Sequence, residues 1–182
     1  MDEPERSLAA TALSIRMLLL DVDGVLTGGG IYLHDGLGEI KRFDVQDGMG
    51  ITMARCAGLK VGILTGRSSA AVFRRAQELK IDVVEQGNSD KASGLRSVLQ
   101  SAGVEAGEIA YVGDDIQDIP VMESVGLPIA VANARPEVKA RALYVTTASG
   151  GHGAVRESVE WLLKLREQFK DVVYRVTHDL VD

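Results

Sequence analysis

Residues 15–27 read IRMLLLDVDGVLT, a short apolar run that leads directly into an acidic turn containing a glycine. The run from 15 to 21 is too short for a helix and predicts a buried β-strand. In an open α/β sheet, ligands bind just beyond the carboxyl ends of the strands, where Asp21 and Asp23 would lie. Residues two apart on an extended chain point the same way, so both carboxyl groups could serve one pocket. The same string is also compatible with a turn that carries no chemistry.

The rest of the chain alternates short apolar runs with longer stretches whose apolar residues are three and four apart. This alternation predicts an α/β fold, a doubly wound, Rossmann-like parallel sheet with helices on both faces. Besides 15–21, the expected strands are 60–64, 82–85, 109–112, 128–132 and 143–147, and the expected helices are 48–57, 69–80, 90–102, 116–125, 136–142 and 153–169. Residues 28–45 break the rhythm, because β-prone runs around Asp35-Gly36 and Gly38 indicate a β-hairpin inserted after the first strand.

Length and composition favour one soluble domain. A chain of 182 residues fits a single core and contains no linker, so we expect residues 1–182 to form one domain whose ends, 1–14 and 170–182, fray. The net charge of −6 disfavours a nucleic-acid partner, which needs clustered lysine and arginine. No apolar run approaches the roughly 20 residues that cross a bilayer, and the start MDEPERS lacks the basic region of an export signal. Together with the single cysteine, Cys56, these features indicate a cytoplasmic protein without a membrane partner.

A second acidic string, GDDIQD at 113–118, follows the expected strand 109–112. Asp114 or Asp115 could complete the coordination of a metal ion, and Asp118, one helical turn later, could orient it. Clustered carboxylates retain protons unless a cation lies between them, and Mg²⁺ prefers such oxygen ligands. Helix capping by aspartate is the alternative, but it explains one aspartate better than three.

Two further strand ends carry groups that suit a phosphate. Thr65, Gly66 and Arg67 follow the expected strand 60–64, where a hydroxyl and backbone amides at a helix entrance could hold phosphoryl oxygens. Lys91 lies in the first turn of the expected helix 90–102, a position where the helix dipole disfavours a cation. The simpler interpretation of Lys91 is a solvated side chain beside Asp90.

The order and spacing of DVDGV, TGR, Lys91 and GDD resemble the motifs of the haloacid dehalogenase superfamily of phosphohydrolases over residues 15–147. The resemblance implies that Asp21 is a nucleophile that forms an aspartyl-phosphate and that Asp23 is the general acid and base. It also implies that Thr65 and Lys91 clamp the phosphate. The implied Mg²⁺ ligands are Asp21, Asp114 and the backbone carbonyl of Asp23.

Longer strings are similar to the small capless phosphatases of this superfamily, especially those acting on 3-deoxy-D-manno-octulosonate 8-phosphate: FDVQDGMGI at 43–51, EQGNSDK at 85–91 and GGHGAVRE at 150–157. This resemblance implies a small phosphorylated sugar-acid substrate, a role in lipopolysaccharide precursor synthesis, and a homotetramer in which the hairpin 28–45 helps cover a neighbouring subunit's site. Arg67 would face the sugar's carboxylate. Arg156 could bind an anion or pair with Glu160 on the same helix.

Three other functions remain open. The first is hydrolysis of another sugar phosphate, such as a nine-carbon sialic-type sugar 9-phosphate, and Leu20, in place of the aromatic residue often found before the nucleophile, weakens the substrate assignment more than the chemistry. The second is a noncatalytic tetramerising domain. The third is a receiver domain that only stores phosphate, although its phosphorylated aspartate would follow a later strand than the first. The complete set of carboxylate, threonine and lysine groups favours catalysis.

Overall fold

The computed structural model describes residues 3–36 and 38–178. Its centre is a parallel sheet of six strands in the order β5-β4-β1-β6-β7-β8. The strands are β1 (Met17–Leu20), β4 (Lys60–Thr65), β5 (Val83–Gln86), β6 (Ile109–Gly113), β7 (Leu127–Ala130) and β8 (Tyr144–Val145). The strand β1 lies between β4 and β6 and all four of its side chains are buried, as its continuous apolar run predicts.

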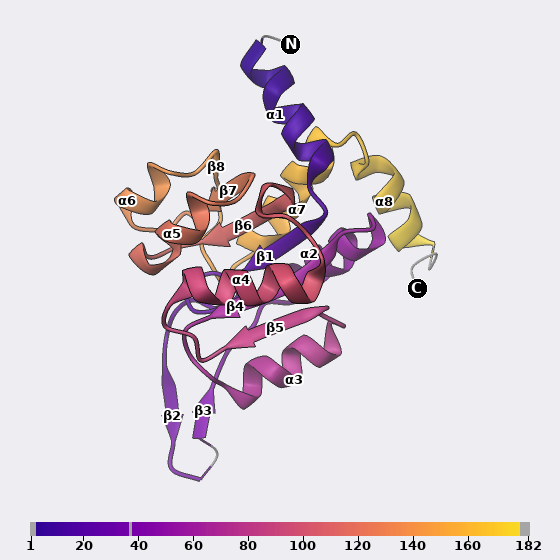
Figure 1. The fold of residues 1–182 in the computed structure, drawn as a ribbon. Helices are drawn as coiled ribbons and strands as arrows, with labels where there is room; N and C mark the ends of the chain where they lie inside the picture. The colour runs from indigo at the N-terminus through magenta and orange to yellow at the C-terminus, as the bar shows by residue number, and fades with distance from the viewer. Residues whose placement is uncertain (1–2, 37, 179–182) are drawn as a thin grey trace.

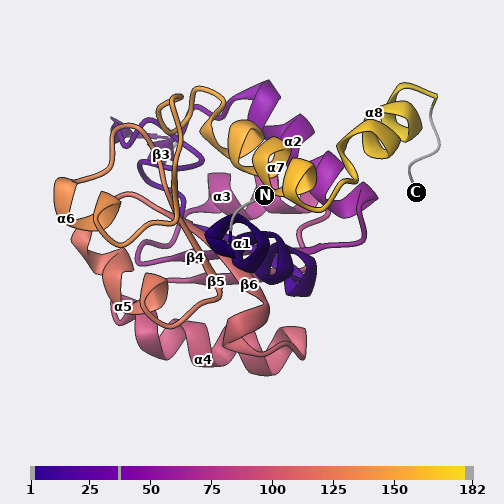
Figure 2. The same cartoon turned by 90° about the horizontal axis from the view of Figure 1, so that it is seen from above.

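Helices cover both faces of the sheet, so the expected doubly wound α/β fold is confirmed. In Figures 1 and 2, α2 (Val45–Cys56) and α7 (Ala154–Leu165) lie on one face, and α4 (Lys91–Ala102) lies on the other. The remaining helices are α1 (Glu3–Ser14), α3 (Ala70–Glu78), α5 (Ile119–Met122), α6 (Pro136–Lys139), α8 (Phe169–Thr177) and the 3₁₀ turns η1 (Ala106–Glu108) and η2 (Ile116–Asp118).

Several expected helices differ from the structure at their ends, and three of them end clearly earlier than expected. The expected helix 116–125 is a 3₁₀ turn followed by one short helix, and Pro120, which has no N–H to donate, stands near the junction. The expected helix 153–169 ends at Leu165, because Glu167 adopts a left-handed backbone (φ 58°) and the chain turns into α8. The expected helix 136–142 ends at Lys139.

Helices also form at both chain ends, where no element was expected. Ala12 of α1 and Val172 of α8 are buried in the core, and Arg166 holds the end of α1 by donating to the backbone oxygens of Ala12 and Ile15. Residues 1–2 and 179–182 lie outside the described part of the chain. The expected fraying of the ends stays a prediction.

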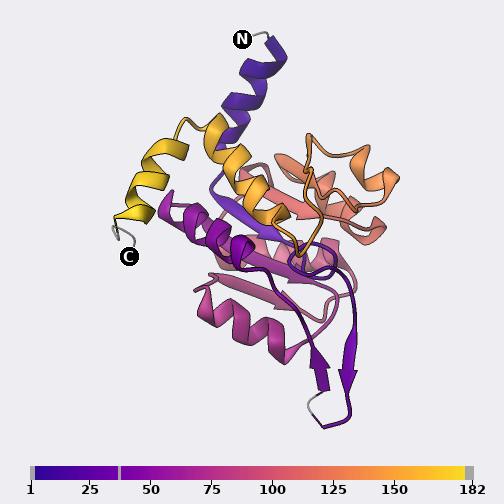
Figure 3. The same ribbon diagram turned by 180° about the vertical axis from the view of Figure 1, so that it is seen from behind.

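The inserted hairpin is confirmed. Strands β2 (Tyr32–His34) and β3 (Gly38–Ile40) pair antiparallel and project from the body of the molecule at the end opposite α1 (Figures 1 and 3). Tyr32, Leu33 and Ile40 expose much of their side chains.

Within residues 3–36 and 38–178, we find no helix with both the length and the apolar character needed to span a membrane.

Candidate active site

The carboxyl ends of β1, β4, β5 and β6 lie along one edge of the sheet, because these strands run parallel. The chain segments that follow them line one cavity of about 390 Å³. The lining residues are Asp21, Asp23, Thr65, Gly66, Arg67, Ser89, Lys91, Asp115 and Gln117. The structure thus brings together the four catalytic candidates from the sequence, which are Asp21, Asp23, Thr65 and Lys91. Of the three substrate-binding candidates, Gly66 and Arg67 line the cavity and Arg156 does not.

Lys91 is a buried cation, not a solvated one. Its side chain is only 4% exposed, and its Nζ lies 2.9 Å from Asp21 Oδ2 and 2.5 Å from Asp118 Oδ1. Burial alone would lower the pKa of Lys91, but the charges of Asp21 and Asp118 outweigh burial and raise it. An ammonium that is charged at neutral pH therefore faces the carboxyl group at the end of β1.

Asp118 connects this lysine to the second acidic string. Its Oδ2 accepts hydrogen bonds from the backbone N–H of Asp114 (2.8 Å) and of Asp115 (3.0 Å), and its Oδ1 accepts from Lys91 and from the Tyr111 hydroxyl (2.6 Å). Asp115 caps η2 by accepting from the Ile116 N–H. Capping therefore accounts for Asp115 and in part for Asp118, which completes a capping box on η2 and in addition holds Lys91 and Tyr111.

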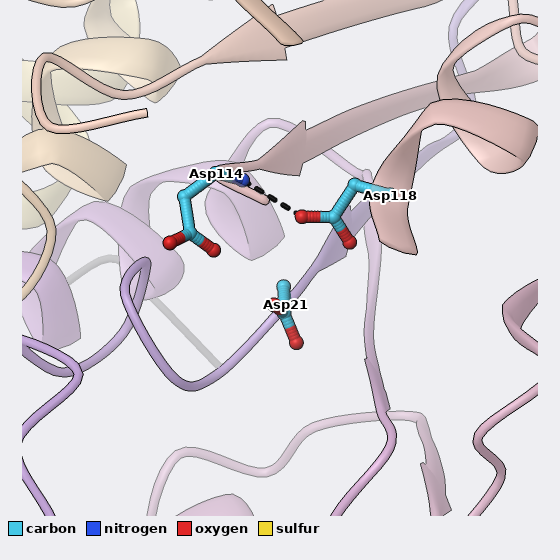
Figure 4. Close-up of side chains that lie close together, drawn as sticks. All are labelled: Asp21, Asp114 and Asp118. Atoms are coloured by element: carbon cyan, nitrogen blue, oxygen red, sulfur yellow. Dashed lines mark hydrogen bonds between the residues drawn. The ribbon is translucent and has the colours of Figure 1, made fainter. Parts of the chain in front are cut away.

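Three carboxyl groups converge beside the cavity. Asp21, Asp114 and Asp118 each offer an oxygen within 4.8 Å of the others, and Figure 4 shows the three side chains around a common space. Burial, followed by the charges of Asp21 and Asp118, raises the pKa of Asp114 to about 8. Burial raises the pKa of Asp21 to about 6; the positive charge of Lys91 acts to lower this pKa, and the negative charge of Asp118 acts to raise it further. This crowding of negative charge is what a cation would relieve.

The donor set fits a magnesium ion. Asp114 Oδ1 is buried and has no hydrogen-bond partner among the described residues, and such an atom normally has one. Every side-chain donor of the cluster is an oxygen, the ligand type that Mg²⁺ prefers. The turn also requires Gly24, because its φ is +97° and a Cβ there would lie 2.0 Å from Asp114 Oδ2.

Asp23 lies apart from this acidic cluster and contacts the hairpin instead. Its Oδ1 lies 2.5 Å from Lys41 Nζ, and its Oδ2 lies 3.8 Å from Arg67 Nε. Arg67 and Lys41 both pair with Glu39 of β3. Neither Glu39 nor Lys41 was singled out from the sequence, because nothing local in the hairpin indicates which side chains fold back over a site.

Arg156 does not line the cavity. Its Nε pairs with Glu160 Oε1 at 2.6 Å, which is the alternative that helical spacing offered. Its backbone N–H and that of Val155 donate to the buried carboxylate of Asp47, which accepts from Gly153 as well. Asp47 of α2 therefore caps α7 from another helix, and a role of Arg156 in substrate binding stays a prediction.

The loop before α7 supports the acidic turn after β1. The Gly151 N–H donates to Val25 O at 2.8 Å. The Asn133 side chain donates from Nδ2 to Gly24 O and accepts at Oδ1 from the Gly150 N–H. The string GGHGAVRE thus contacts the turn that contains Asp21 and Asp23 through the backbone, a role that its side chains did not reveal.

Comparisons with known proteins agree with this geometry. A model of the haloacid dehalogenase-like hydrolase family matches residues 81–157. The chain is 46% identical over 154 residues to the 3-deoxy-D-manno-octulosonate 8-phosphate phosphatase KdsC of Escherichia coli K12, covering 85% of this chain and 82% of the relative.

Solved structures of the same kind superpose closely. One is the 3-deoxy-D-manno-octulosonate 8-phosphate phosphatase of Moraxella catarrhalis in complex with magnesium, phosphate and KDO (TM-score 0.89, 37% identity, covering 94% of this chain and 98% of that one). Another is the enzyme of Yersinia pestis (TM-score 0.85, 39% identity, covering 90% and 89%). On this evidence, the chain belongs to the 3-deoxy-D-manno-octulosonate 8-phosphate phosphatases of the haloacid dehalogenase superfamily.

Proposed function

We propose that this protein hydrolyses 3-deoxy-D-manno-octulosonate 8-phosphate to the free sugar acid and inorganic phosphate. The observation that carries the proposal is the contact between the Asp21 carboxylate and the buried Lys91 ammonium, in a cavity that Thr65 also lines. A nucleophile, a cation and a hydroxyl at one place suit phosphoryl transfer, which depends on positioning and charge neutralisation. The relatives named above act on this sugar-acid phosphate.

The side chains divide the reaction between them. An Asp21 oxygen attacks phosphorus, and the bond between phosphorus and the sugar's ester oxygen breaks, which leaves an aspartyl-phosphate. Lys91 and Thr65 hold the phosphoryl oxygens, with backbone amides at Gly66. Asp23 gives its proton to the leaving sugar oxygen, then takes a proton from the water that attacks phosphorus. Phosphate leaves and the Asp21 carboxylate is restored.

Magnesium would be held by Asp21, Asp114 and the backbone carbonyl of Asp23, and it would offset the negative charge that the carboxylates and the phosphate share. Asp118 supports this arrangement by holding Lys91 and the backbone of Asp114.

The test is phosphate release from 3-deoxy-D-manno-octulosonate 8-phosphate in the presence of Mg²⁺, with the wild-type protein beside Asp21→Asn. We expect kcat to fall by at least about a thousandfold, because removal of a nucleophile commonly costs this much or more. Asp171→Asn, on the exposed face of α8, is the matched control and should keep full activity. Full turnover by Asp21→Asn would show that the nucleophile is assigned wrongly.

A substrate panel separates the other functions. Faster hydrolysis of a nine-carbon sialic-type sugar 9-phosphate or of a neutral hexose phosphate would identify a different sugar phosphate as the substrate. A noncatalytic tetramerising domain would release no phosphate. A receiver domain would retain one phosphate on an aspartate without multiple turnover.

The larger organisation belongs to the same proposal. Residues 1–182 form one phosphatase domain, and four copies assemble through the hairpin 28–45, whose exposed Ile31, Tyr32 and Leu33 suit burial against a neighbour. The enzyme works in the cytoplasm, in lipopolysaccharide precursor synthesis.

A further inference from the structure

Arg67 already holds a carboxylate at the rim of the cavity. Its guanidinium, 49% exposed, donates from Nη2 to Glu39 Oε1 at 2.9 Å. Glu39 comes from β3, 28 residues earlier in the chain, and is only 12% exposed. The hairpin of the same subunit therefore supplies an acid to the one guanidinium among the residues that line the cavity.

Glu39 has a second partner that does not depend on Arg67. Its Oε1 lies 3.3 Å from Lys41 Nζ, and Lys41 is itself buried and bound to Asp23. Burial alone would raise the pKa of Glu39, but hydrogen bonds from Arg67 and Lys41 outweigh it and hold the pKa below its ordinary value. Glu39 is therefore a charged carboxylate at neutral pH, and it keeps a cationic partner if Arg67 turns away.

We propose that Glu39 occupies the place at Arg67 that the carboxylate of the substrate takes, so that a sugar-acid substrate must displace the hairpin's own acid. This inference rests on the proposed function, which gives the substrate a carboxylate. Two carboxylates on one fork of a guanidinium repel each other. Lys41 is already paired with Asp23, so it does not offer the substrate's carboxylate another partner. Binding of the substrate therefore moves Arg67 from Glu39 to the substrate. An ester without a carboxylate leaves the pair intact.

The displacement is easy enough to be compatible with catalysis. Arg67 is half exposed, and exposed ion pairs are weak because water and salt screen them. Loss of the competing charge should therefore tighten binding of the sugar-acid phosphate by about two- to fivefold, the range that such weak pairs correspond to.

The experiment compares Glu39→Gln with the wild-type enzyme on 3-deoxy-D-manno-octulosonate 8-phosphate and on a neutral hexose phosphate. We expect KM for the sugar-acid phosphate to fall about two- to fivefold, with no change for the neutral ester. Glu78→Gln, which removes the similar Arg75–Glu78 pair on α3, is the matched control and should change neither value. In an Arg67→Ala background, Glu39→Gln should have no further effect on KM.

The outcomes separate the two proposals. A rise in KM, an equal change for both substrates, or a gain that persists in Arg67→Ala would overturn the competition and make Glu39 a residue that holds Arg67 or Lys41 in position. Wild-type enzyme that does not hydrolyse the sugar-acid phosphate would instead overturn the proposed function and, with it, this inference.

Discussion

Tyr111 is the residue whose importance only its surroundings reveal. It lies in β6, completely buried, and donates its hydroxyl hydrogen bond to Asp118 Oδ1 at 2.6 Å while Lys91 Nζ lies 3.4 Å from the same hydroxyl. Burial, together with the charge of Asp118, raises the pKa of Tyr111 well above its usual value, so the hydroxyl stays a donor. The tyrosine thus restrains the carboxylate that holds Lys91.

Tyr111→Phe should lower kcat by about tenfold, which corresponds to about 1.4 kcal/mol of transition-state stabilisation, with a smaller change in KM. The ring still fills its place, but Asp118 loses one donor and Lys91 becomes less well held. Steady-state kinetics check the kcat effect. Tyr144→Phe is the control, because it also removes a hydroxyl from a carboxylate, that of Glu157, outside the cavity. Equal kcat values for the two variants would contradict a positioning role.

The predicted magnesium site can be tested at Asp114. Mg²⁺ at about one hundred times its dissociation constant should add about 2.7 kcal/mol to the free energy of unfolding, or about 5–10 °C in Tm for a chain of this size. Asp114→Asn should remove most of this shift, whereas Asp115→Asn, whose carboxyl group caps η2, should retain it. Differential scanning calorimetry with and without Mg²⁺ measures the shift. A full shift in Asp114→Asn would remove Asp114 from the ligands.

Among the elements, α7 is held at its N-terminal end by two carboxylates, one from another helix and one from its own first turn. Its N-cap residue is Gly153, which has no side chain, and Asp47 of α2 accepts the free N–H groups instead. Glu157, in the first turn of α7, reaches back to the residues that follow β8. Two carboxylates thus join α7 to α2 and to the edge of the sheet. Both lie at the N-terminal end of α7, where the positive end of the helix dipole stabilises a negative charge.

Glu157→Gln tests how much the hydrogen bonds between Glu157 and the residues after β8 contribute to the free energy of unfolding. Burial would raise the pKa of Glu157, but hydrogen bonds from the N–H groups of Thr147 and Ala148 and from Tyr144 outweigh it and lower the pKa below 4.5. A lowered folded-state pKa means that the charged form stabilises the fold above about pH 4.5 and that this stabilisation is lost as the pH falls through the folded-state value. The substitution should cost about 1–3 kcal/mol at neutral pH.

The measurement is urea unfolding of both proteins as a function of pH. The difference between wild type and Glu157→Gln should shrink steadily below about pH 4.5. A difference that stays constant down to about pH 3 would mean that the charge of Glu157 contributes nothing.

At the scale of the whole molecule, the hairpin projects from the body of the protein (Figure 3) and leaves large apolar side chains uncovered. An isolated pair of strands is at best marginally stable in water, and Leu33 of β2 is 80% exposed. Ion pairs of Glu39 and Lys41 hold one side of the hairpin to Asp23 and Arg67, whereas Leu33, which pairs with Glu39 in β2, stays exposed, and the hairpin as a whole projects from the sheet (Figure 3). Burial against other copies of the chain would cover this apolar surface.

Leu33→Asp should break the proposed tetramer into smaller species, because a charge cannot be buried in an apolar contact without a partner. Size-exclusion chromatography with light scattering measures the mass in solution. Leu13→Asp, at an exposed position of α1 far from the hairpin, should keep the wild-type mass. An unchanged mass for Leu33→Asp would exclude the hairpin from the interface.

The sequence by itself determined the class of fold and the edge of the sheet at which the chemistry lies. Short apolar runs, such as 15–21, that alternate with helical stretches indicate strands of a parallel sheet covered on both faces, and parallel strands direct their carboxyl ends to one edge. The positions of Asp21, Thr65 and Asp114 follow from this rule, since each residue ends or follows a strand. These are local patterns joined by one general rule of topology.

The tertiary structure alone decided which partners the site residues have. Lys91 proved to be buried between Asp21 and Asp118, Asp23 proved to contact Lys41, and Arg156 proved to face Glu160 and not the cavity. The helices at the chain ends likewise depend on contacts with distant segments. Such contacts join residues far apart in the chain, and their energies depend on distance and burial, which no local pattern of residues encodes.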